Sequence, residues 1–311
     1  MGQNTLIHLT GVCKSFTNAQ GESTGVLRDV DIDVTDGTLM AVVGLNGAGK
    51  TTLLRLIAGM EKPDAGEIKI LCESAQYSQP TTGIGGVSPQ NKIPSLNMSR
   101  VPAVQARSAE ILSEQQGVGG GSPKLGYVWQ DYRSSLLPWY DAADNIALPL
   151  KAEGMNRKER REKAVELLRE VGEPFAPDAR IYNLSGGQQQ LIAILRSVVV
   201  SPDVMLMDEP LSALDQLRAW EVSLLLEKLW LKRKPPMLFI SHDIDDAILL
   251  ANEILFVSKS HGGVAARIKV ELPRPRTIPM LASPAVQEIR SKIFALFDAE
   301  KRLTTVPWKG K

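Results

Sequence analysis

The sequence predicts an α/β protein with a mainly parallel β-sheet. Three observations support this fold class: short apolar segments alternate with helical segments, a glycine-rich loop lies between one such pair, and the 311-residue chain is 43% hydrophobic. Strands that alternate with helices pair in parallel, because each helix carries the chain back across a face of the sheet. A chain of this size and apolar content can bury a substantial core.

The first part of the chain reads as strands. Residues 5–12 (TLIHLTGV) and 25–34 (GVLRDVDIDV) place apolar residues at about every second position, and residues 39–43 (LMAVV) form a short apolar run. This pattern predicts a β-rich start. The loop GLNGAGK follows the third strand, and the helical spacing of TTLLRLIAG ends at Gly59.

The segment from about residue 72 to 123 changes composition to serine, glutamine, glycine, proline and asparagine. We interpret it as an exposed and largely disordered insertion. Within it, AVQARSAEILSEQQ has the spacing of a short amphipathic helix, so a regulatory or docking element is the alternative to a tolerated surface loop. Long loops are tolerated because loop entropy rises only slowly with length.

Strands and helices alternate again after residue 123. The segments KLGYVWQ, DVMLMDEP and PPMLFISHD predict strands, and the charged segment MNRKERREKAVELLREVG predicts a helix with a solvated face. The helix around WEVSLLLEKLWLK separates the last two strands. We expect one domain over residues 1–260, followed at 261–311 by a short C-terminal appendage that contains LPRPRTIP and a helix.

Composition excludes several classes of function. Lysine plus arginine number 36 and aspartate plus glutamate number 35, so no overall field attracts nucleic acid, and we expect no nucleic-acid partner. The two cysteines fit a reducing compartment. No window reaches the roughly 20 uninterrupted apolar residues of a membrane span, and the N-terminus lacks a secretion signal. Any work at a membrane therefore requires another polypeptide.

Residues 44–51, GLNGAGKT, fit the phosphate-binding pattern G-x-x-x-x-G-K-[ST]. Glycines let the backbone wrap a phosphate, Lys50 supplies a positive charge to the β- and γ-phosphates, and the Thr51 hydroxyl can ligate Mg²⁺. The position between a strand and a helix is the one that this mechanism requires. We expect further phosphate-loop contacts from Gly44, Asn46, Gly47, Gly49 and Thr52.

Carboxylates end the strand VMLMDEP, at the sheet edge where α/β proteins bind ligands. Asp208 fits the residue that steadies Mg²⁺, and Glu209 fits a general base that polarises an attacking water. The alternative is a carboxylate pair that only caps the next turn. His242 follows the next strand and fits a γ-phosphate sensor, although a lone histidine is usually structural. Gln130, after YVWQ, is uninformative by itself.

In LSGGQQQ, residues 184–190, two glycines stand at the start of an apolar helix. Each glycine inside a helix costs about 1 kcal/mol relative to alanine, so the pair requires a reason. At a helix N-terminus, bare N–H groups that bind an anion can be that reason. GLNGAGKTT, VWQ, LSGGQQQ, VMLMDEP, SALD and ISHD occur in that order, and together they resemble the ATP-binding subunit of an ABC transporter. This resemblance, which covers about residues 5–260 apart from the insertion, implies a P-loop NTPase (RecA-like) core with an antiparallel β subdomain. It also implies a helical subdomain at about 131–184.

The resemblance implies roles for further residues. Phe16 would stack on adenine, and Gln130 would touch Mg²⁺ or water and couple to a transmembrane subunit. The signature residues Ser185, Gly186, Gly187 and Gln188 would bind the γ-phosphate of ATP held by a second ATP-binding subunit. Asp215, in SALD, would cross that dimer interface. With one copy of each motif the chain must form a homodimer or a heterodimer.

The resemblance also implies partners. A transmembrane permease and an extracytoplasmic solute-binding protein would place this chain at the cytoplasmic face of the inner membrane, as a peripheral subunit. SSLLPWYDAADNIALPL and LPRPR resemble importers of nitrate, sulfonate or taurine, although the solute would never touch this chain. Two alternatives stay open: a soluble regulatory or assembly ATPase, and a degenerate subunit, since Leu191 stands where many relatives have arginine.

Overall fold

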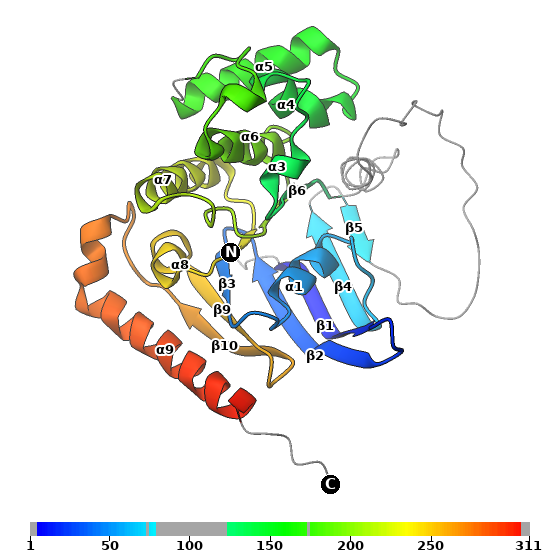
Figure 1. Ribbon diagram of the computed structural model, residues 1–311, viewed down its shortest axis with the longest axis vertical. Coiled ribbons are helices and arrows are strands. Elements are labelled where there is room, and N and C mark those ends of the chain that lie inside the picture. Colours follow the sequence, from blue (N-terminus) through cyan, green and yellow to red (C-terminus); the bar gives the residue numbers. More distant parts are fainter. Residues whose placement is uncertain (1–4, 73–74, 79–122, 173–174, 306–311) are drawn as a thin grey trace.

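The computed structural model describes residues 5–72, 75–78, 123–172 and 175–305. Its centre is a six-stranded sheet in which all pairs are parallel except β10 with β9 (Figure 1). The predicted α/β class is therefore confirmed. In spatial order its strands are β10 (Gly263–Lys269), β9 (Glu253–Ser258), β3 (Leu39–Val43), β8 (Met237–Ile240), β7 (Val204–Met207) and β6 (Leu125–Val128).

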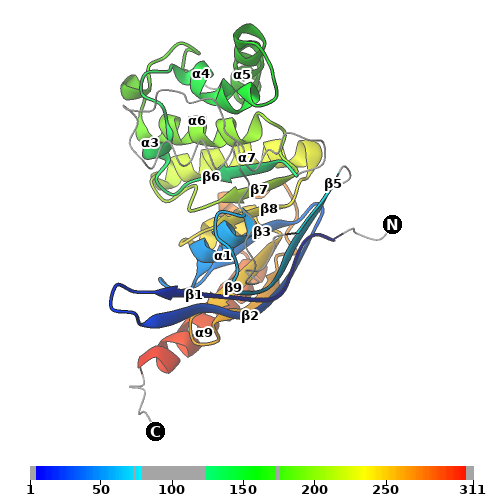
Figure 2. The same ribbon diagram turned by 90° about the vertical axis from the view of Figure 1, so that its right-hand side faces the viewer.

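Both faces of this sheet are covered, which explains its continuous apolar strands. In β3, Met40 and Val42 face one core cluster, whereas Leu39, Ala41 and Val43 face another. The first cluster includes α1 (Lys50–Ile57), and the second includes α7 (Gln216–Arg233), α8 (Ile244–Leu250) and α9 (Pro284–Thr305). Figure 2 shows α1 between the two sheets of the molecule.

The second sheet is antiparallel and has four strands, in the order β2 (Ser23–Thr35), β1 (Thr5–Thr17), β4 (Ala65–Cys72) and β5 (Ala75–Ser78). The strand β5 lies inside the segment that we interpret as an insertion, so regular structure extends beyond residue 72. Residues 79–122, which hold the rest of that segment and its helical stretch, lie outside the described residues.

A layer of helices lies above β6 in Figure 1. Its α-helices are α3 (Tyr132–Ser135), α4 (Ala142–Ala147), α5 (Arg157–Val171) and α6 (Gly186–Val198), with 3₁₀ turns at Leu148–Lys151 and Ile181–Asn183. The charged helix α5 begins at an Asn156 capping box and ends at Gly172, which has a φ of 74°. Its buried residues are Ala164 and Leu168, in keeping with a solvated outer face.

Buried Asn145 organises the loop that contains LLPW. Its side-chain amide donates to the carbonyl oxygens of Leu137 and Asp141 at 3.0 Å, and its oxygen accepts from the Leu137 N–H at 2.8 Å. One fully buried polar side chain thus joins several backbone groups of this loop to the start of α4.

The predicted appendage after residue 260 includes β10, η3 (Ile278–Ala282) and α9. The strand β10 is the edge of the six-stranded sheet, paired with β9, and Val286, Ile289 and Ile293 of α9 are buried in the second core cluster. This part of the chain is therefore built into the same core, because its apolar face completes the cover of the sheet.

Candidate functional site

The phosphate-type loop connects β3 to α1 and requires glycine at several positions. Gly47 and Gly49 have φ values of 76° and 98°, which favour glycine. A Cβ atom on Gly44 would overlap the carbonyl oxygen of Val257, and one on Gly49 would lie 2.9 Å from Cγ1 of Val26. The loop is therefore closely packed on both sides, against backbone at Gly44 and against side chains at Gly49. Asn46 and Gly47 are exposed at its tip, whereas Thr52 is half-buried in α1.

The Lys50 side chain lies inside this loop. Its ammonium donates to the carbonyl oxygens of Gly44 at 2.9 Å and Leu45 at 3.1 Å, and the residue is 6% exposed. Burial lowers the pKa of Lys50, while the negative charges of Glu209 and Asp208 partly offset that effect. The loop thus holds a desolvated cation among backbone groups.

Asp208 follows β7 and faces Thr51 at the start of α1. The Thr51 hydroxyl donates to an Asp208 carboxylate oxygen at 3.2 Å, and Asp208 is 2% exposed. Burial raises the pKa of Asp208, and the hydrogen bond from Thr51 works against that rise. A hydroxyl next to a buried carboxylate is the oxygen donor set that Mg²⁺ prefers, so these residues fit a metal site.

Three strand ends bring Gln130, Glu209 and His242 together. The Gln130 amide donates to one Glu209 carboxylate oxygen at 2.9 Å, and His242 Nε2 lies 2.5 Å from the other. These residues follow the parallel strands β6, β7 and β8, whose carboxyl ends meet at one sheet edge. Glu209 also has a φ of 53°, an uncommon conformation for a non-glycine residue. The sheet therefore places the Glu209 carboxylate, which is contacted from two sides, next to Asp208.

The signature residues open α6 in the helical layer. The Ser185 hydroxyl accepts from the Gln188 N–H at 3.3 Å, and the Gln188 side chain accepts from the Ser185 N–H at 3.0 Å. This capping box leaves Gly186 and Gly187 at the first two helical positions. Among the described residues, no hydrogen bond joins these four residues to the phosphate-type loop, and Figure 1 shows α6 apart from α1.

The remaining predicted site residues, Phe16 and Asp215, lie away from this edge of the sheet. Phe16 is 42% exposed near the end of β1, where the ammonium of Lys14 lies 5.3 Å from its ring centroid. Asp215 is exposed and caps α7, accepting from the Arg218 N–H at 3.1 Å. The structure thus gathers the predicted phosphate, metal and base residues at one edge, and leaves the signature, Phe16 and Asp215 outside it.

Sequence reasoning missed residues around the signature helix. A Cβ atom on Gly186 would lie 3.0 Å from the Tyr132 hydroxyl and 3.2 Å from the Arg133 guanidinium. On the same helix, Arg196 donates to the carbonyl and hydroxyl oxygens of Ser135 at 2.6 and 2.7 Å, and burial lowers the pKa of Arg196 to about 10. No motif marks these contacts, because they join residues about 60 positions apart.

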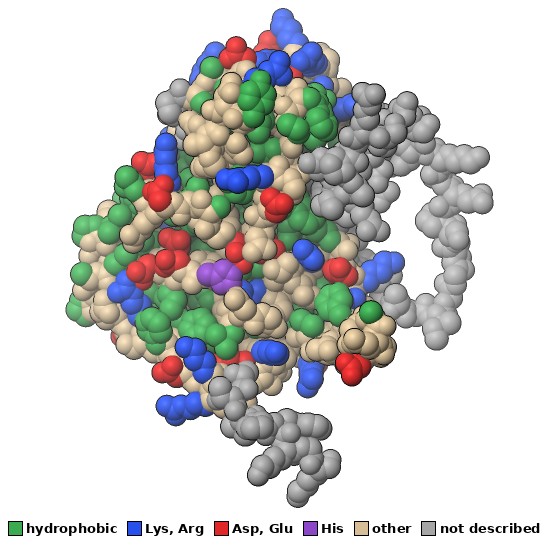
Figure 3. Space-filling model, viewed as in Figure 1, with side chains coloured by type: hydrophobic (Ala, Val, Ile, Leu, Met, Phe, Trp, Pro, Cys, Tyr) green, Lys and Arg blue, Asp and Glu red, His purple; other side chains and the backbone are tan. Residues whose placement is uncertain are grey.

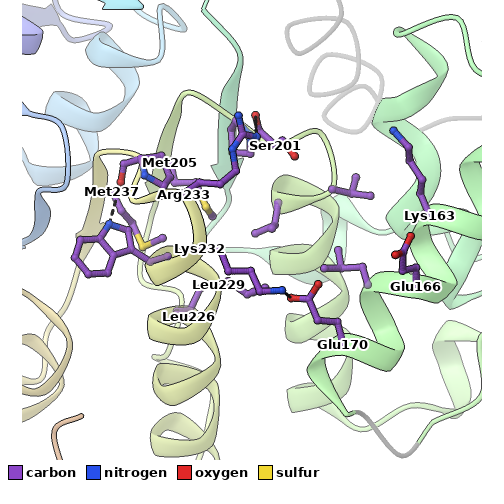
Figure 4. Close-up of a pocket in the computed structure, with 16 residues that line it drawn as sticks. Lys163, Glu166, Glu170, Ser201, Met205, Leu226, Leu229, Lys232, Arg233 and Met237 are labelled. Atoms are coloured by element: carbon purple, nitrogen blue, oxygen red, sulfur yellow. Dashed lines mark hydrogen bonds and ion pairs between the residues drawn. The ribbon is translucent and has the colours of Figure 1, made fainter. Parts of the chain in front are cut away.

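A hollow of about 300 Å³ lies between α5, α7 and the starts of β7 and β8 (Figure 4). Apolar side chains such as Leu226 and Leu229 line it, and Lys232 forms an ion pair with Glu170 at its edge. Met205 and Met237 stand near the beginnings of their strands, whereas Asp208 and His242 follow strand ends. The hollow is therefore at the opposite end of the sheet from the candidate site.

Comparison with known proteins identifies this arrangement. Residues 27–212 match the family model described as ABC transporter, which spans both the phosphate-type loop and the signature. The chain belongs to the ABC transporter family. As an ABC transporter family member it carries the ATP-binding cassette fold, with the phosphate-type loop and the residues that follow β7 and β8 at the carboxyl edge of the sheet. None of the helices among the described residues has the length and apolar character needed to cross a membrane.

Individual relatives agree with this assignment. The chain is 34% identical over 266 residues to the taurine import ATP-binding protein TauB of Sinorhizobium fredii, covering 86% of this chain and 81% of that protein. It is 32% identical over 276 residues to the aliphatic sulfonates import ATP-binding protein SsuB 1 of Shouchella clausii, covering 89% and 86%. A dimeric, post-hydrolysis structure of the ATP-binding cassette MJ0796 with ADP and phosphate has a TM-score of 0.63 at 25% identity, covering 86% of this chain and all of that one.

Proposed function

We propose that this ABC transporter family member is an ATPase that drives a separate importer permease. The observation that carries the proposal is the meeting of Gln130 and His242 on the two oxygens of Glu209, at the same sheet edge as Asp208. The alternative, a carboxylate that only caps the turn after its strand, does not require contacts from two other side chains. A carboxylate held from two sides, beside a desolvated lysine and a hydroxyl–carboxylate pair, is organised for phosphoryl chemistry.

The bound nucleotide is assigned to the phosphate-type loop. Lys50 and the loop N–H groups of Gly47 and Gly49 bind the β- and γ-phosphates, with Gly44, Asn46 and Thr52 completing the loop, and Phe16 offers its exposed ring to adenine. Thr51, Asp208 and Gln130 would hold Mg²⁺, which would neutralise developing charge on the phosphate oxygens.

Glu209 acts as the general base. Its carboxylate takes a proton from a water whose oxygen forms a bond to the γ-phosphorus, while the bond from that phosphorus to the ADP oxygen breaks. Gln130 orients Glu209 through its 2.9 Å hydrogen bond. The His242 side chain contacts Glu209 and is 44% exposed, so it can also bind the γ-phosphate.

A second copy or a related subunit completes the site. The bare N–H groups at Gly186 and Gly187 form an anion-binding helix start, yet they lie in the helical layer apart from this chain's own Lys50. Ser185, Gln188 and Asp215 would face the partner's ATP across the interface. The dimeric form of the related cassette structures supports this arrangement. ATP then favours the closed dimer, and hydrolysis releases it.

The import function rests on relatives whose names include taurine import and aliphatic sulfonates import. The loop held by Asn145 exposes Trp139, at 49%, and so offers a surface to a permease subunit. The face in Figure 3 mixes basic and acidic side chains without a continuous basic stripe, which favours protein partners over nucleic acid. We place the chain at the cytoplasmic face of the inner membrane, with a permease and a solute-binding protein for a small anion such as nitrate, sulfonate or taurine.

The experiment is Glu209→Gln, which preserves size and one acceptor but removes the base. We expect phosphate release from MgATP to fall by about 10²-fold or more, with nucleotide binding retained and an ATP-dependent dimer visible by light scattering. Glu67→Gln is the matched control, because the Glu67 side chain is 45% exposed on β4 and pairs with Lys69. Unchanged hydrolysis by Glu209→Gln would refute the base assignment.

The import role has its own test. Purification of the chain from native membranes in mild detergent, followed by mass spectrometry, should recover a multi-spanning permease. Recovery of soluble partners alone would contradict the import function and leave the ATPase assignment standing.

A further inference from the structure

The turn between β9 and β10, residues 258–263, is bound by a buried carboxylate from the end of the chain. Glu300 of α9 is 2% exposed, and its oxygens accept from the Ser258 hydroxyl at 2.5 Å, the Ser260 hydroxyl at 2.6 Å and the Ser260 N–H at 2.9 Å. Burial raises the pKa of the Glu300 carboxyl, but the hydrogen bonds from Ser258 and Ser260 outweigh it and hold the pKa below its ordinary value.

This turn continues directly into one wall of the phosphate-type loop. Val257 precedes Ser258, and Phe256 pairs with Val43 where β9 runs beside β3. The Val257 carbonyl is packed so tightly against Gly44 that a Cβ atom there would overlap it. Since the Gly44 carbonyl accepts from the Lys50 ammonium, a shift of Val257 would move Gly44 and with it that ammonium.

The same turn also fixes the opposite wall. The Gly262 carbonyl in this turn accepts from the Arg28 N–H of β2 at 2.6 Å, although β2 and the β9–β10 hairpin belong to different sheets. Immediately before Arg28, Val26 and Leu27 pack against Gly49, where a Cβ atom would lie 2.9 and 3.0 Å from their side chains. The turn therefore links the strand segments that enclose the first and last glycines of the loop.

We propose that Glu300 is a positioning residue for the phosphate-type loop. A glycine-rich loop has few side chains of its own to hold it, so its shape depends on the walls around it. Glu300 fixes the turn that joins both walls, and α9 carries this carboxylate across the sheet to the β9–β10 hairpin (Figure 1). The C-terminal helix thus pre-organises nucleotide binding without touching the nucleotide, an inference that rests on the proposed function of that loop.

The test is Glu300→Gln, which replaces a carboxylate that accepts from the hydroxyls of Ser258 and Ser260 and from backbone N–H groups with an amide that offers one acceptor oxygen. We expect the dissociation constant for a fluorescent MgATP analogue, and KM for ATP, to rise about five- to tenfold, with kcat changed less than about twofold. Glu288→Gln is the matched control, because Glu288 lies on the same helix and pairs with exposed Lys292. A general loss of folding would instead lower kcat, and thermal melting of both variants monitors it.

A double-mutant cycle adds a readout that is independent of one variant's stability. Ser260→Ala removes one donor to Glu300, so Ser260→Ala and Glu300→Gln should weaken nucleotide binding by less together than the product of their separate effects. Wild-type affinity in Glu300→Gln, or effects of the two substitutions that multiply fully, would overturn the positioning role of Glu300. Hydrolysis by the wild-type protein would still support the proposed function in that case. Weakened binding in Glu300→Gln with no hydrolysis by the wild type would support the positioning role and refute the ATPase function.

Discussion

Arg276→Met tests whether the buried arginine of LPRPR holds the end of α8. The Arg276 side chain is 2% exposed and donates to the carbonyl oxygens of Ile248 at 2.6 Å, Ala251 at 2.5 Å and Val270 at 3.0 Å. Two of these carbonyls lie at the C-terminus of α8, where a positive charge also interacts favourably with the helix dipole. The guanidinium therefore satisfies backbone groups that the helix leaves open.

The magnitude follows from two opposing terms. Three hydrogen bonds from a charged donor contribute about 1.5–3 kcal/mol each. Against them, burial and the neighbouring charge of Arg274 lower the pKa of Arg276 to about 10, which corresponds to a cost of about 3 kcal/mol for keeping the guanidinium charged. Because methionine keeps the apolar stem but leaves the three carbonyls without this donor, we expect the free energy of unfolding to fall by about 1.5–6 kcal/mol.

The assay is urea unfolding followed by circular dichroism, at constant protein concentration. Arg267→Met is the matched control, since Arg267 pairs with Glu253 on the surface of β10 and should cost less than about 1 kcal/mol. Equal losses in the two variants would refute the reasoning, because they would show that the buried bonds of Arg276 only balance its desolvation.

Two further predictions concern the candidate site and the helix behind it. Gln130→Ala removes the 2.9 Å bond that orients Glu209, so hydrolysis should fall by about tenfold; unchanged turnover would contradict the orienting role. Burial beside Asp243 and Asp245 raises the pKa of Asp246 from 3.8 to about 6, so its folded form holds a proton that the unfolded chain has lost between those pH values. Stability therefore falls as pH rises through that window, and Asp246→Asn should raise the free energy of unfolding at pH 7.5 by about 1–3 kcal/mol but leave it unchanged near pH 3. Asp245→Asn, which breaks the ion pair with Arg290, should destabilise at pH 7.5 and is the control; equal responses would sink the assignment.

Local patterns predicted the elements whose sequences carry strong signals. The five residues of β3 are all buried, and the glycine loop lies between β3 and α1, as the order of apolar run, glycines and helical spacing indicates. By contrast, Asn252 and Glu253 interrupt the apolar stretch around residues 247–258, but this interruption did not predict that a helix ends and a strand begins there. The structure divides it at Asn252, whose side chain accepts from the Leu39 N–H at 2.8 Å and donates to the Gly37 carbonyl at 3.1 Å. Such a division depends on a neighbour more than 200 residues away, which periodicity does not see.

The sequence by itself determined the fold class and the family resemblance, and it singled out the candidate chemistry-bearing residues. The motifs behind the resemblance are short and contiguous, so their residue types and spacing can be read from the sequence alone. Tertiary structure alone decided that Gln130 and His242 meet on Glu209, and that the segment after residue 260 belongs to the core. It also placed Glu300 on the turn behind the phosphate-type loop. Those arrangements arise from strand pairing and packing between distant segments, and pairing partners are fixed by the whole folded chain rather than by any local sequence.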